Sequence, residues 1–554
     1  MPALGNPDRR IRWILLCFVM MFFAVGVRVV FLQTVQASEL SQQAAQQHVQ
    51  QFDLPARRGT IFDRGGNELA VGEETRTIYA TPYLIEDPLG TSKFIGEILK
   101  QDSNTILEKL SDRDSGFVYL ARRVDTRLAE EIEKRNIAGI GFLSEEKRKY
   151  PQNQVASQVI GFAGMDNRGL TGLELQMDDF LSGVGGRQRV ITDAGGKQIE
   201  MLSLEEGTRG TDVWLTIDQA IQFETEKVLT ETVKQWSAKG ACAVVMNPKT
   251  GEVYAMVNVP TADANRFDSL TEDQRRNRVV TDSYEPGSVF KSVTAAAGLE
   301  EKAVAPGQSL YLPPELELGG RTIKDAVDRG EVSWDLSQIL VHSSNVGAVT
   351  VGMRVGDEML DSWIRRFGFG APTGIDYPGE AQGIVVPPEL WSGSTIGNVP
   401  IGQGISVTAL QMASAYSTIA NGGVLMKPHL VGRVGAEEQE QPEGQRIISE
   451  QTSRLLATYL TQVVEEGGAP LAQINGYHVA GKTGTAQKPM PDGSGYSEEN
   501  YIGSFIGFAP ANDPQLVVMV MVDEPHPFGG GATVAAPAFQ KITQFSLQKL
   551  RIVP

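Results

Sequence analysis

The pattern of hydrophobic and polar positions changes along the 554-residue chain. Residues 13–27 form an unbroken apolar run, which resumes after Arg28 and continues to Leu32. Helical periodicities with charged faces and short strand-like stretches then alternate as far as about residue 210. Beyond that point, apolar runs with the length of buried strands lie on both sides of a largely helix-compatible middle. Because the chain is too long for one core, two or three folded units are expected.

The first apolar run is predicted to be a membrane anchor. Residues 13–32 reach the roughly 20 residues that a helix needs to cross a bilayer, if Arg28 is counted as a snorkelling end residue. Three arginines precede the run, so the positive-inside rule predicts a cytoplasmic tail over residues 1–12 and places the rest of the chain outside the cytoplasm. The alternative is a cleaved signal peptide, because residues 35–37 offer small-residue cleavage chemistry. Arg28, Phe31 and Leu32 before that site favour the uncleaved anchor.

The last 344 residues or so predict an α+β domain that begins near residue 211. Residues 241–246 and 252–257 are apolar, and the Asn-Pro-Lys-Thr-Gly segment between them predicts a hairpin. Two further β-rich runs, 503–509 and 515–522, lie near the C-terminus and precede a helix-compatible stretch, 535–550. The start and the end of the domain are therefore expected to meet in one sheet.

Composition excludes several classes of function. A formal charge of −17 and no long run of Lys and Arg argue against a nucleic-acid partner. The two cysteines, Cys17 and Cys242, do not support a disulfide framework or a cysteine-based zinc site. The five histidines lack any metal-ligand spacing, so neither a metal nor another cofactor is predicted.

The first candidate for chemistry is the pair Ser288 and Lys291. They follow a Pro-Gly turn and open a helix-compatible run, and their spacing of three puts both side chains on one helical face. There the Ser288 hydroxyl can lie within hydrogen-bond reach of Lys291, which is the arrangement of an activated nucleophile without a histidine. Alone, the spacing is common in ordinary helices. It becomes specific because Ser343-Ser344-Asn345 and Lys482-Thr483-Gly484-Thr485 follow in the order S-x-x-K, S-x-N, K-T-G.

In these three motifs the chain resembles the penicillin-recognising serine transferases. A fourth motif narrows the resemblance: residues 58–70 match R-G-x-I-x-D-R-x-G-x-x-L-A at every fixed position. That motif marks the start of the non-catalytic module of class B penicillin-binding proteins. The resemblance implies a transpeptidase domain with a central antiparallel sheet and helices on both faces, over residues 211–554. An elongated α+β pedestal of the dimerisation type is implied over residues 33–210.

The resemblance also implies a role for each motif residue. Ser288 is the nucleophile and Lys291 takes its proton, which requires burial or a second cation such as Lys482 to lower the lysine pKa. Ser343 relays a proton to the leaving group, and Asn345 binds a substrate amide or Lys291. The hydroxyls of Thr483 and Thr485, with Gly484 between them, bind the substrate. The backbone amides of Ser288 and Thr485 form the oxyanion hole.

The implied reaction is cross-linking of peptidoglycan stem peptides, or of their lipid-linked precursor, through a D-Ala-D-Ala acyl-enzyme that β-lactams also form. The implied address is the bacterial inner membrane, with the catalytic domain outside. The implied partners are a polytopic glycosyltransferase of the shape, elongation, division and sporulation class and other cell-division membrane proteins. Thr483 in K-T-G and the short pedestal favour septal synthesis. The alternatives are an elongation transpeptidase, a β-lactamase or carboxypeptidase, and a β-lactam sensor.

Overall fold

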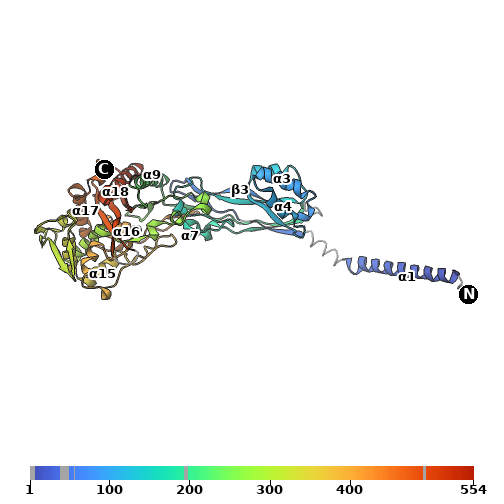
Figure 1. Cartoon of the computed structure of the whole chain (residues 1–554), viewed down its shortest axis with the longest axis horizontal. Helices are drawn as coiled ribbons and strands as arrows, with labels where there is room; N and C mark the ends of the chain where they lie inside the picture. Colours follow the sequence, from blue (N-terminus) through green and yellow to red (C-terminus); the bar gives the residue numbers. More distant parts are fainter. Residues whose placement is uncertain (1–6, 38–48, 55, 193–197, 491–494) are drawn as a thin grey trace. The chain divides into compact units, whose positions relative to one another are not determined.

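The computed structural model describes residues 7–37, 49–54, 56–192, 198–490 and 495–554 (Figure 1). The first six residues of the expected cytoplasmic tail lie outside this described part. The chain forms two compact units built from interleaved segments. The first unit comprises residues 1–57, 74–147 and 184–209, and the second comprises residues 58–73, 148–183 and 210–554.

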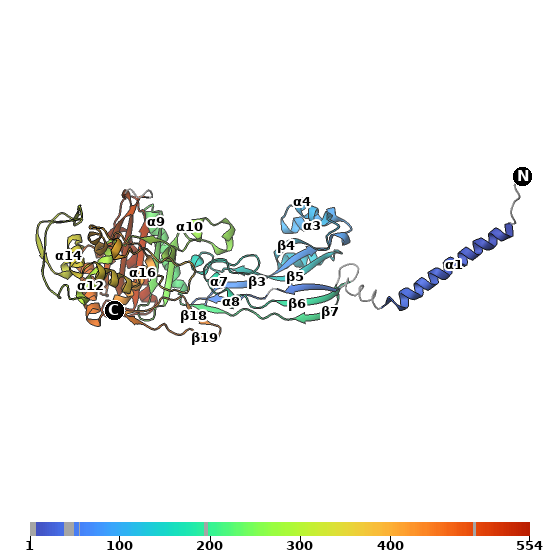
Figure 2. The ribbon, with the colours of Figure 1, turned by 90° about the horizontal axis from the view of Figure 1, so that it is seen from below.

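The first unit contains the apolar helix and a small α+β arrangement. Over the described residues, α1 is the helix that is long and apolar enough to span a bilayer, from Ile11 to Thr34. In Figure 2, α3 and α4 lie beside β4 and β5, where buried residues such as Ile95 and Leu110 form a core. The elements are α1 (Pro7–Thr34), β1 (Val49–Leu54), β3 (Glu68–Ala80), α3 (Pro88–Leu99), α4 (Ser103–Ser111), β4 (Val118–Asp125), α5 (Thr126–Glu133), β5 (Ile140–Lys149), β6 (Gly186–Thr192) and β7 (Gln198–Glu205).

The strands that the structure describes in this unit lie in two sheets. Strands β1, β6 and β7 form a three-stranded antiparallel sheet. Strand β3 pairs with β4 and β5 through its later residues, which belong to the first unit. Its first residues belong to the second unit and pair with β2 (Ile61–Phe62), which in turn pairs in parallel with β8 (Val213–Leu215). The strands β18 (Val431–Val434) and β19 (Glu437–Glu438) extend that part of the sheet.

The second unit is organised around a five-stranded sheet in the order β10-β9-β23-β22-β21, with all neighbours antiparallel. Its strands are β9 (Gly240–Met246), β10 (Val253–Val259), β21 (Ala480–Pro489), β22 (Tyr496–Ala509) and β23 (Leu516–Asp523). The predicted hairpin of residues 241–257 is thus confirmed, and so is the meeting of the two ends of the domain in one sheet. The expected helix at 535–550 is α18 (Gly531–Lys549), which begins four residues earlier.

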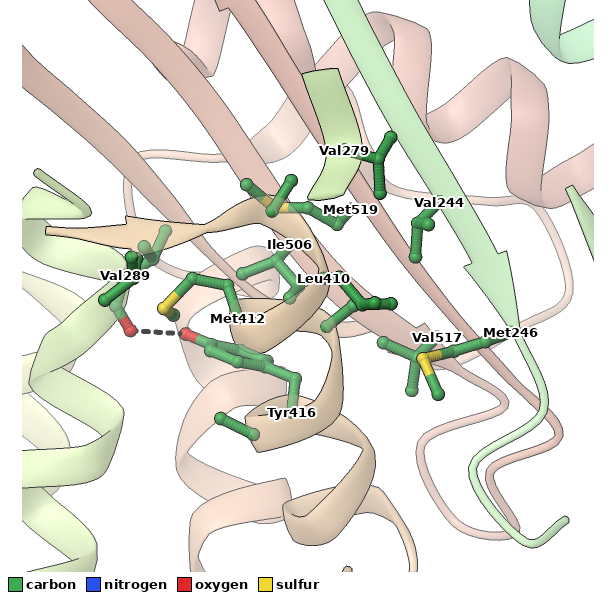
Figure 3. Close-up of a cluster of buried hydrophobic side chains, with 14 of the residues drawn as sticks. Val244, Met246, Val279, Val289, Leu410, Met412, Tyr416, Ile506, Val517 and Met519 are labelled. Carbon is green, nitrogen blue, oxygen red and sulfur yellow. Dashed lines mark hydrogen bonds between the residues drawn. The ribbon is translucent and has the colours of Figure 1, made fainter. Parts of the chain in front are cut away.

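Helices cover both faces of this sheet, as the α+β expectation requires. Along β9, Ala243 and Val245 pack with the core under α9 (Gln219–Gln235) and α18, whereas Val244 and Met246 pack with the core under α16 (Ala409–Ala420). Figure 3 shows this second side, with the two β9 side chains beside Leu410 of α16. Successive residues of a strand point to opposite faces, so an all-apolar strand requires cover on both.

The remaining elements surround this core. Helix α12 packs against α14 and against α17, and α17 in turn packs against α16. The elements are α6 (Ser157–Ile160), α7 (Gly172–Gln176), α8 (Asp178–Leu181), α10 (Glu272–Arg275), α11 (Arg278–Thr281), β11 (Ser283–Tyr284), η3 (Gly287–Phe290), α12 (Lys291–Glu300), β12 (Leu310–Leu312), β13 (Glu315–Leu318), β14 (Arg321–Lys324), β15 (Val332–Trp334), α13 (Leu336–Val341), α14 (Asn345–Val355), α15 (Asp357–Arg366), β16 (Val407–Thr408), β17 (Val424–Leu425), β20 (Gln445–Arg446) and α17 (Glu450–Glu465).

Candidate active site

Ser288 lies in a tight turn and not in the α-helix itself. Residues 287–290 form the 3-10 turn η3, and α12 begins at Lys291. Gly287 has φ +58°, and its amide donates to the carbonyl of Gly402 at 2.9 Å, which ties the turn to a neighbouring loop. The buried Tyr416 hydroxyl of α16 also donates to the carbonyl of Val289 at 2.9 Å (Figure 3). The turn is therefore held from two sides while Ser288 stays half-exposed.

Lys291 is buried, with 1% of its surface exposed. Its ammonium donates to the carbonyl of Ser343 at 2.6 Å, to the Ser343 hydroxyl at 3.3 Å and to the Asn345 side-chain oxygen at 2.7 Å. Among the described residues, Ser288 is not one of its hydrogen-bond partners. Burial, and then the nearby charge of Lys482, hold the pKa of Lys291 well below its ordinary value. A lysine in this setting can become the neutral amine that accepts a proton.

The second motif lies between α13 and α14. Ser343 has φ +53°, a left-handed conformation that is uncommon for a residue with a side chain. Ser344 is the N-cap of α14, where its hydroxyl accepts from the amide of Gly347 at 2.9 Å. The cap and the left-handed residue together turn the chain so that Ser343 and Asn345 both reach Lys291.

Lys482 comes from β21, at an edge of the five-stranded sheet. It is also 1% exposed, and its ammonium donates to the Ser343 hydroxyl at 3.0 Å. Burial lowers the pKa of Lys482 to about 8. The Ser343 hydroxyl thus receives hydrogen bonds from both lysines, and it can pass a proton between groups on either side.

The same strand brings the third motif against the Ser288 turn. A Cβ at Gly484 would meet the Ser504 hydroxyl at 2.4 Å and the carbonyl of Pro286 at 3.0 Å, so this position requires glycine. Thr483 is half-buried and Thr485 is exposed. The Thr485 hydroxyl oxygen accepts from the amide of Gly531 at 3.1 Å, and its own hydrogen remains available to a ligand.

These residues open onto one cavity of about 540 Å³. Five of the predicted site residues line it, namely Ser288, Ser343, Asn345, Thr483 and Thr485. Lys291 and Lys482 are not among its lining residues, but both donate to the lining residue Ser343, and Lys291 also donates to Asn345. Three motifs separated by up to 194 positions in the sequence, from Ser288 to Lys482, therefore meet at one cleft.

Comparisons with known proteins agree with this geometry. Residues 241–544 match the model of the penicillin binding protein transpeptidase domain, and residues 53–215 match that of the penicillin-binding protein dimerisation domain. The chain is similar to penicillin-binding protein PbpB of Mycolicibacterium smegmatis, at 35% identity over 95% of this chain and 88% of that protein. The chain belongs to the class B penicillin-binding proteins. It is a peptidoglycan D,D-transpeptidase.

Other relatives of this penicillin-binding protein carry several names. Stage V sporulation protein D of Bacillus subtilis is 35% identical over 99% of this chain and 86% of its own length. Peptidoglycan D,D-transpeptidase FtsI of Escherichia coli is 31% identical over 98% of this chain and 92% of its own length. A crystal structure of penicillin binding protein 3 from Mycobacterium tuberculosis, complexed with aztreonam, has a TM-score of 0.72 and 30% identity, and covers 91% of this chain and 98% of that one.

Several residues at the cleft lie outside the sequence motifs of the penicillin-binding proteins and were not predicted from the sequence. Asp325, Arg329, Trp334 and His342 line it from the segment before the second motif. Beside the cleft lining, Glu285 accepts from the amide of Gly404 and from the hydroxyl of Tyr496, each at 3.0 Å, so it joins the Ser288 turn to the Gly404 loop and to the start of β22. Burial raises the pKa of Glu285. The signals in the sequence were weak, namely an Asp and an Arg four positions apart and a Glu three positions before Ser288.

A metal centre finds no support in the part of the chain that the structure describes, where no group of three His, Cys, Asp or Glu side chains could hold an ion. Cys242 is buried in β9, and its burial raises the pKa of its thiol.

Proposed function

We propose that this transpeptidase works through an acyl-enzyme on Ser288, with Lys291 as the general base. One observation carries the proposal: two buried lysines with lowered pKa values both donate to the hydroxyl of Ser343, which lines the same cleft as Ser288. Buried cations without a carboxylate partner in contact are costly, so they are typical of reaction centres.

The proposed reaction has two acyl transfers. The Ser288 oxygen attacks the carbonyl carbon of the D-Ala-D-Ala peptide bond of a stem peptide, and its proton moves to neutral Lys291. The amides of Ser288 and Thr485 stabilise the oxyanion. The C–N bond then breaks, and the leaving amine of the terminal D-Ala takes a proton through Ser343. An amino group on a neighbouring stem attacks the ester, loses its proton to the same groups and releases Ser288, which leaves a cross-link.

The proposed donor peptide lies as an added strand along the free edge of β21. Its terminal carboxylate would sit beside Lys482 and accept from the hydroxyls of Thr483 and Thr485. The free hydrogen on Thr485, whose oxygen already accepts from Gly531, supports that orientation. β-Lactams would occupy the same position and acylate Ser288, in keeping with the aztreonam complex of the related mycobacterial protein.

We further propose that the enzyme is anchored by residues 13–32, with residues 1–12 in the cytoplasm, a pedestal over 33–210 and the transpeptidase domain over 211–554 outside the membrane. The apolar span within α1 and the arginines before it support this orientation. The proposed partners are a polytopic glycosyltransferase of the shape, elongation, division and sporulation class and other membrane proteins of cell division.

Septal wall synthesis is the pathway that we propose for this enzyme, with elongation as the alternative. The K-T-G motif with Thr483, the short pedestal and the likeness to the protein named FtsI support it. Depletion in the native host provides the test. Filaments with unclosed septa are expected, whereas round cells that still divide would assign the enzyme to elongation.

Covalent labelling tests the acyl-enzyme itself. A fluorescent penicillin is expected to label the full-length protein and to fail with Ser288→Ala, while Ser283→Ala, which alters an exposed serine five residues earlier, keeps the label. A stable adduct supports the transpeptidase, and rapid loss of label in the wild type would indicate a β-lactamase. Retained labelling of Ser288→Ala would overturn the assignment of the nucleophile.

A further inference from the structure

The second motif is clamped by two consecutive residues that belong to none of the three motifs. The carbonyl of Lys324, the last residue of β14, accepts from the Asn345 side-chain amide at 2.9 Å. The next residue, Asp325, accepts from the Ser344 hydroxyl at 3.0 and 2.9 Å and from the amide of Val346 at 3.0 Å. Three successive residues of the motif and its helix start are thus tied to this short segment.

Asp325 is itself held in place from the other side. Its carboxylate forms an ion pair with Arg329 at 2.6 Å, and only 8% of the Asp325 side chain and 11% of the Arg329 side chain are exposed. A second arm of the guanidinium donates to the carbonyls of Leu312, Pro313 and Gly330 at 3.2, 3.1 and 2.9 Å. A buried carboxylate with this many charged and neutral donors has one well-defined position.

A stack of side chains continues from this ion pair to the strained residue of the motif. The Arg329 guanidinium lies 5.0 Å from the centre of the Trp334 ring. Trp334 in turn stacks on His342, with ring centres 4.4 Å apart. His342 immediately precedes Ser343, the residue with φ +53°. Asp325, Arg329, Trp334 and His342 all line the cleft, so this stack forms one of its walls.

The charges around the buried lysine also include Asp325. Two charged groups act on Lys291: Lys482, from β21, lowers its pKa, and Asp325, from the segment after β14, raises it, although burial has the largest effect. Arg329 offsets part of the Asp325 charge, and His342 stacks on Trp334. The position of Asp325 therefore affects both the shape of the second motif and the electrostatics of the proposed base.

We propose that Asp325 is a positioning residue of the active site: it holds the Ser343-Ser344-Asn345 turn in its left-handed form and sets the charge that faces the Lys291 ammonium. This inference rests on the proposed role of Lys291. The role of Lys291 is tested by the acylation rate of Lys291→Arg, whereas the ratio between the Asp325 variant and the wild type tests Asp325, so the two proposals fail separately.

The simpler alternative is an ion pair that stabilises the start of α14 and nothing else. Such a role would lower the folding stability of a variant and leave the pH dependence of the folded enzyme unchanged. The chain offers a matched control for it. Asp361 and Arg365 in α15 form another Asp–Arg ion pair with the same spacing of four, at 2.8 Å; the carboxylate is again mostly buried, the guanidinium is more exposed, and neither residue lines the cleft.

The experiment measures the second-order rate of acylation by a fluorescent penicillin as a function of pH, on the full-length protein in detergent. The variants are Asp325→Asn, Ser344→Ala and Asp361→Asn. Asp325→Asn is expected to lower the rate about 10- to 100-fold, because small displacements of reacting groups have effects of that size. It is also expected to move the rising limb of the profile to lower pH, since the group that raises the pKa of Lys291 is lost.

The other two variants separate the effect of Asp325 on the geometry of the second motif from the effect of its charge on Lys291. Ser344→Ala removes one hydroxyl and no charge, so its rate is expected to fall while the rising limb stays in place. Asp361→Asn is expected to match the wild type in both respects. A profile of Asp325→Asn that superimposes on the wild type would overturn the proposal. If that variant does not fold, Ser344→Ala decides the positioning role, which a rate within about twofold of the wild type would contradict.

Discussion

Two clusters of buried charge within the same compact unit are built on opposite principles. In the first, Glu174 is fully buried and accepts from Arg58 at 2.7 Å and from Arg148 at 2.6 Å, while Arg58 also pairs with Asp178 at 2.6 Å. In the second, Lys291 and Lys482 are both buried and donate to neutral oxygens of Ser343 and its neighbours.

The difference shows in the pKa values. Burial alone would lower the pKa of Arg58, but Glu174 and Asp178 outweigh it and the pKa is raised. For Lys291, burial and the neighbouring cation act in the same direction, and the pKa is lowered. Buried opposite charges that form ion pairs keep each other charged and fix the contact between their segments. Two buried like charges lower the pKa of a lysine, so that it can change its protonation state.

The first cluster uses arginine and the second uses lysine, and only lysine can lose its proton. Replacing Lys291 by arginine should therefore have the largest effect on the acylation rate. Lys291→Arg places the cation of the first cluster in the second, where it cannot give up its proton. Acylation is expected to fall about 10²- to 10⁴-fold, nearly as far as in Lys291→Ala. In the wild type the rate should rise with pH as Lys291 loses its proton. Near-normal labelling of the arginine variant would make Lys291 an electrostatic partner only.

Breaking the first cluster should change stability and not chemistry. Glu174→Gln leaves two buried guanidinium groups without their shared carboxylate, and a loss of about 3–5 kcal/mol in the free energy of unfolding is expected. Urea unfolding measures that loss, and penicillin labelling of the folded fraction should stay close to that of the wild type. Lost labelling with unchanged stability would show that this cluster acts on the active site.

Glu226 is a buried carboxylate that has no cationic partner among the described residues, so it resembles neither the ion-pair cluster nor the lysine pair. Glu226 accepts from the amide of Ala156 and from Gln222, both at 2.8 Å, and burial raises its pKa to about 7. Its contribution to stability is complete below the ordinary pKa of 4.5 and is lost as pH rises through about 7. Glu226→Gln keeps the acceptor oxygen, so it should stabilise the protein by roughly 3 kcal/mol at pH 8 and have no such effect at pH 4. Equal effects at both pH values would contradict the raised pKa.

The smallest effect is expected at the surface. Lys149 and Glu73 form a salt bridge at 2.7 Å, but both side chains are nearly half exposed. Glu73→Gln should therefore change the free energy of unfolding by less than about 1 kcal/mol. As a control for Glu174→Gln, it isolates burial as the cause. A loss as large as that of Glu174→Gln would mean that the removal of any carboxylate in this region destabilises the fold.

The sequence by itself determined the α+β class of the catalytic domain, the hairpin of β9 and β10, and the three motifs at the cleft. These features are local: an apolar run of strand length needs cover on both faces, and residue types at short spacing carry their own chemistry. The apolar run near the N-terminus could also be recognised as a candidate membrane span, because the thickness of the bilayer sets the length of a helix that crosses it.

Only the tertiary structure decided which groups touch. The spacing of Ser288 and Lys291 predicted a direct contact within one helix, yet a 3-10 turn carries Ser288 and the ammonium donates to Ser343 and Asn345. Asp325 could not be identified from its neighbours in the sequence, since its partner Ser344 lies 19 positions away and meets it through packing. Burial, hydrogen-bond geometry and the pKa values that follow from them depend on contacts between distant segments, and such contacts exist only in the folded chain.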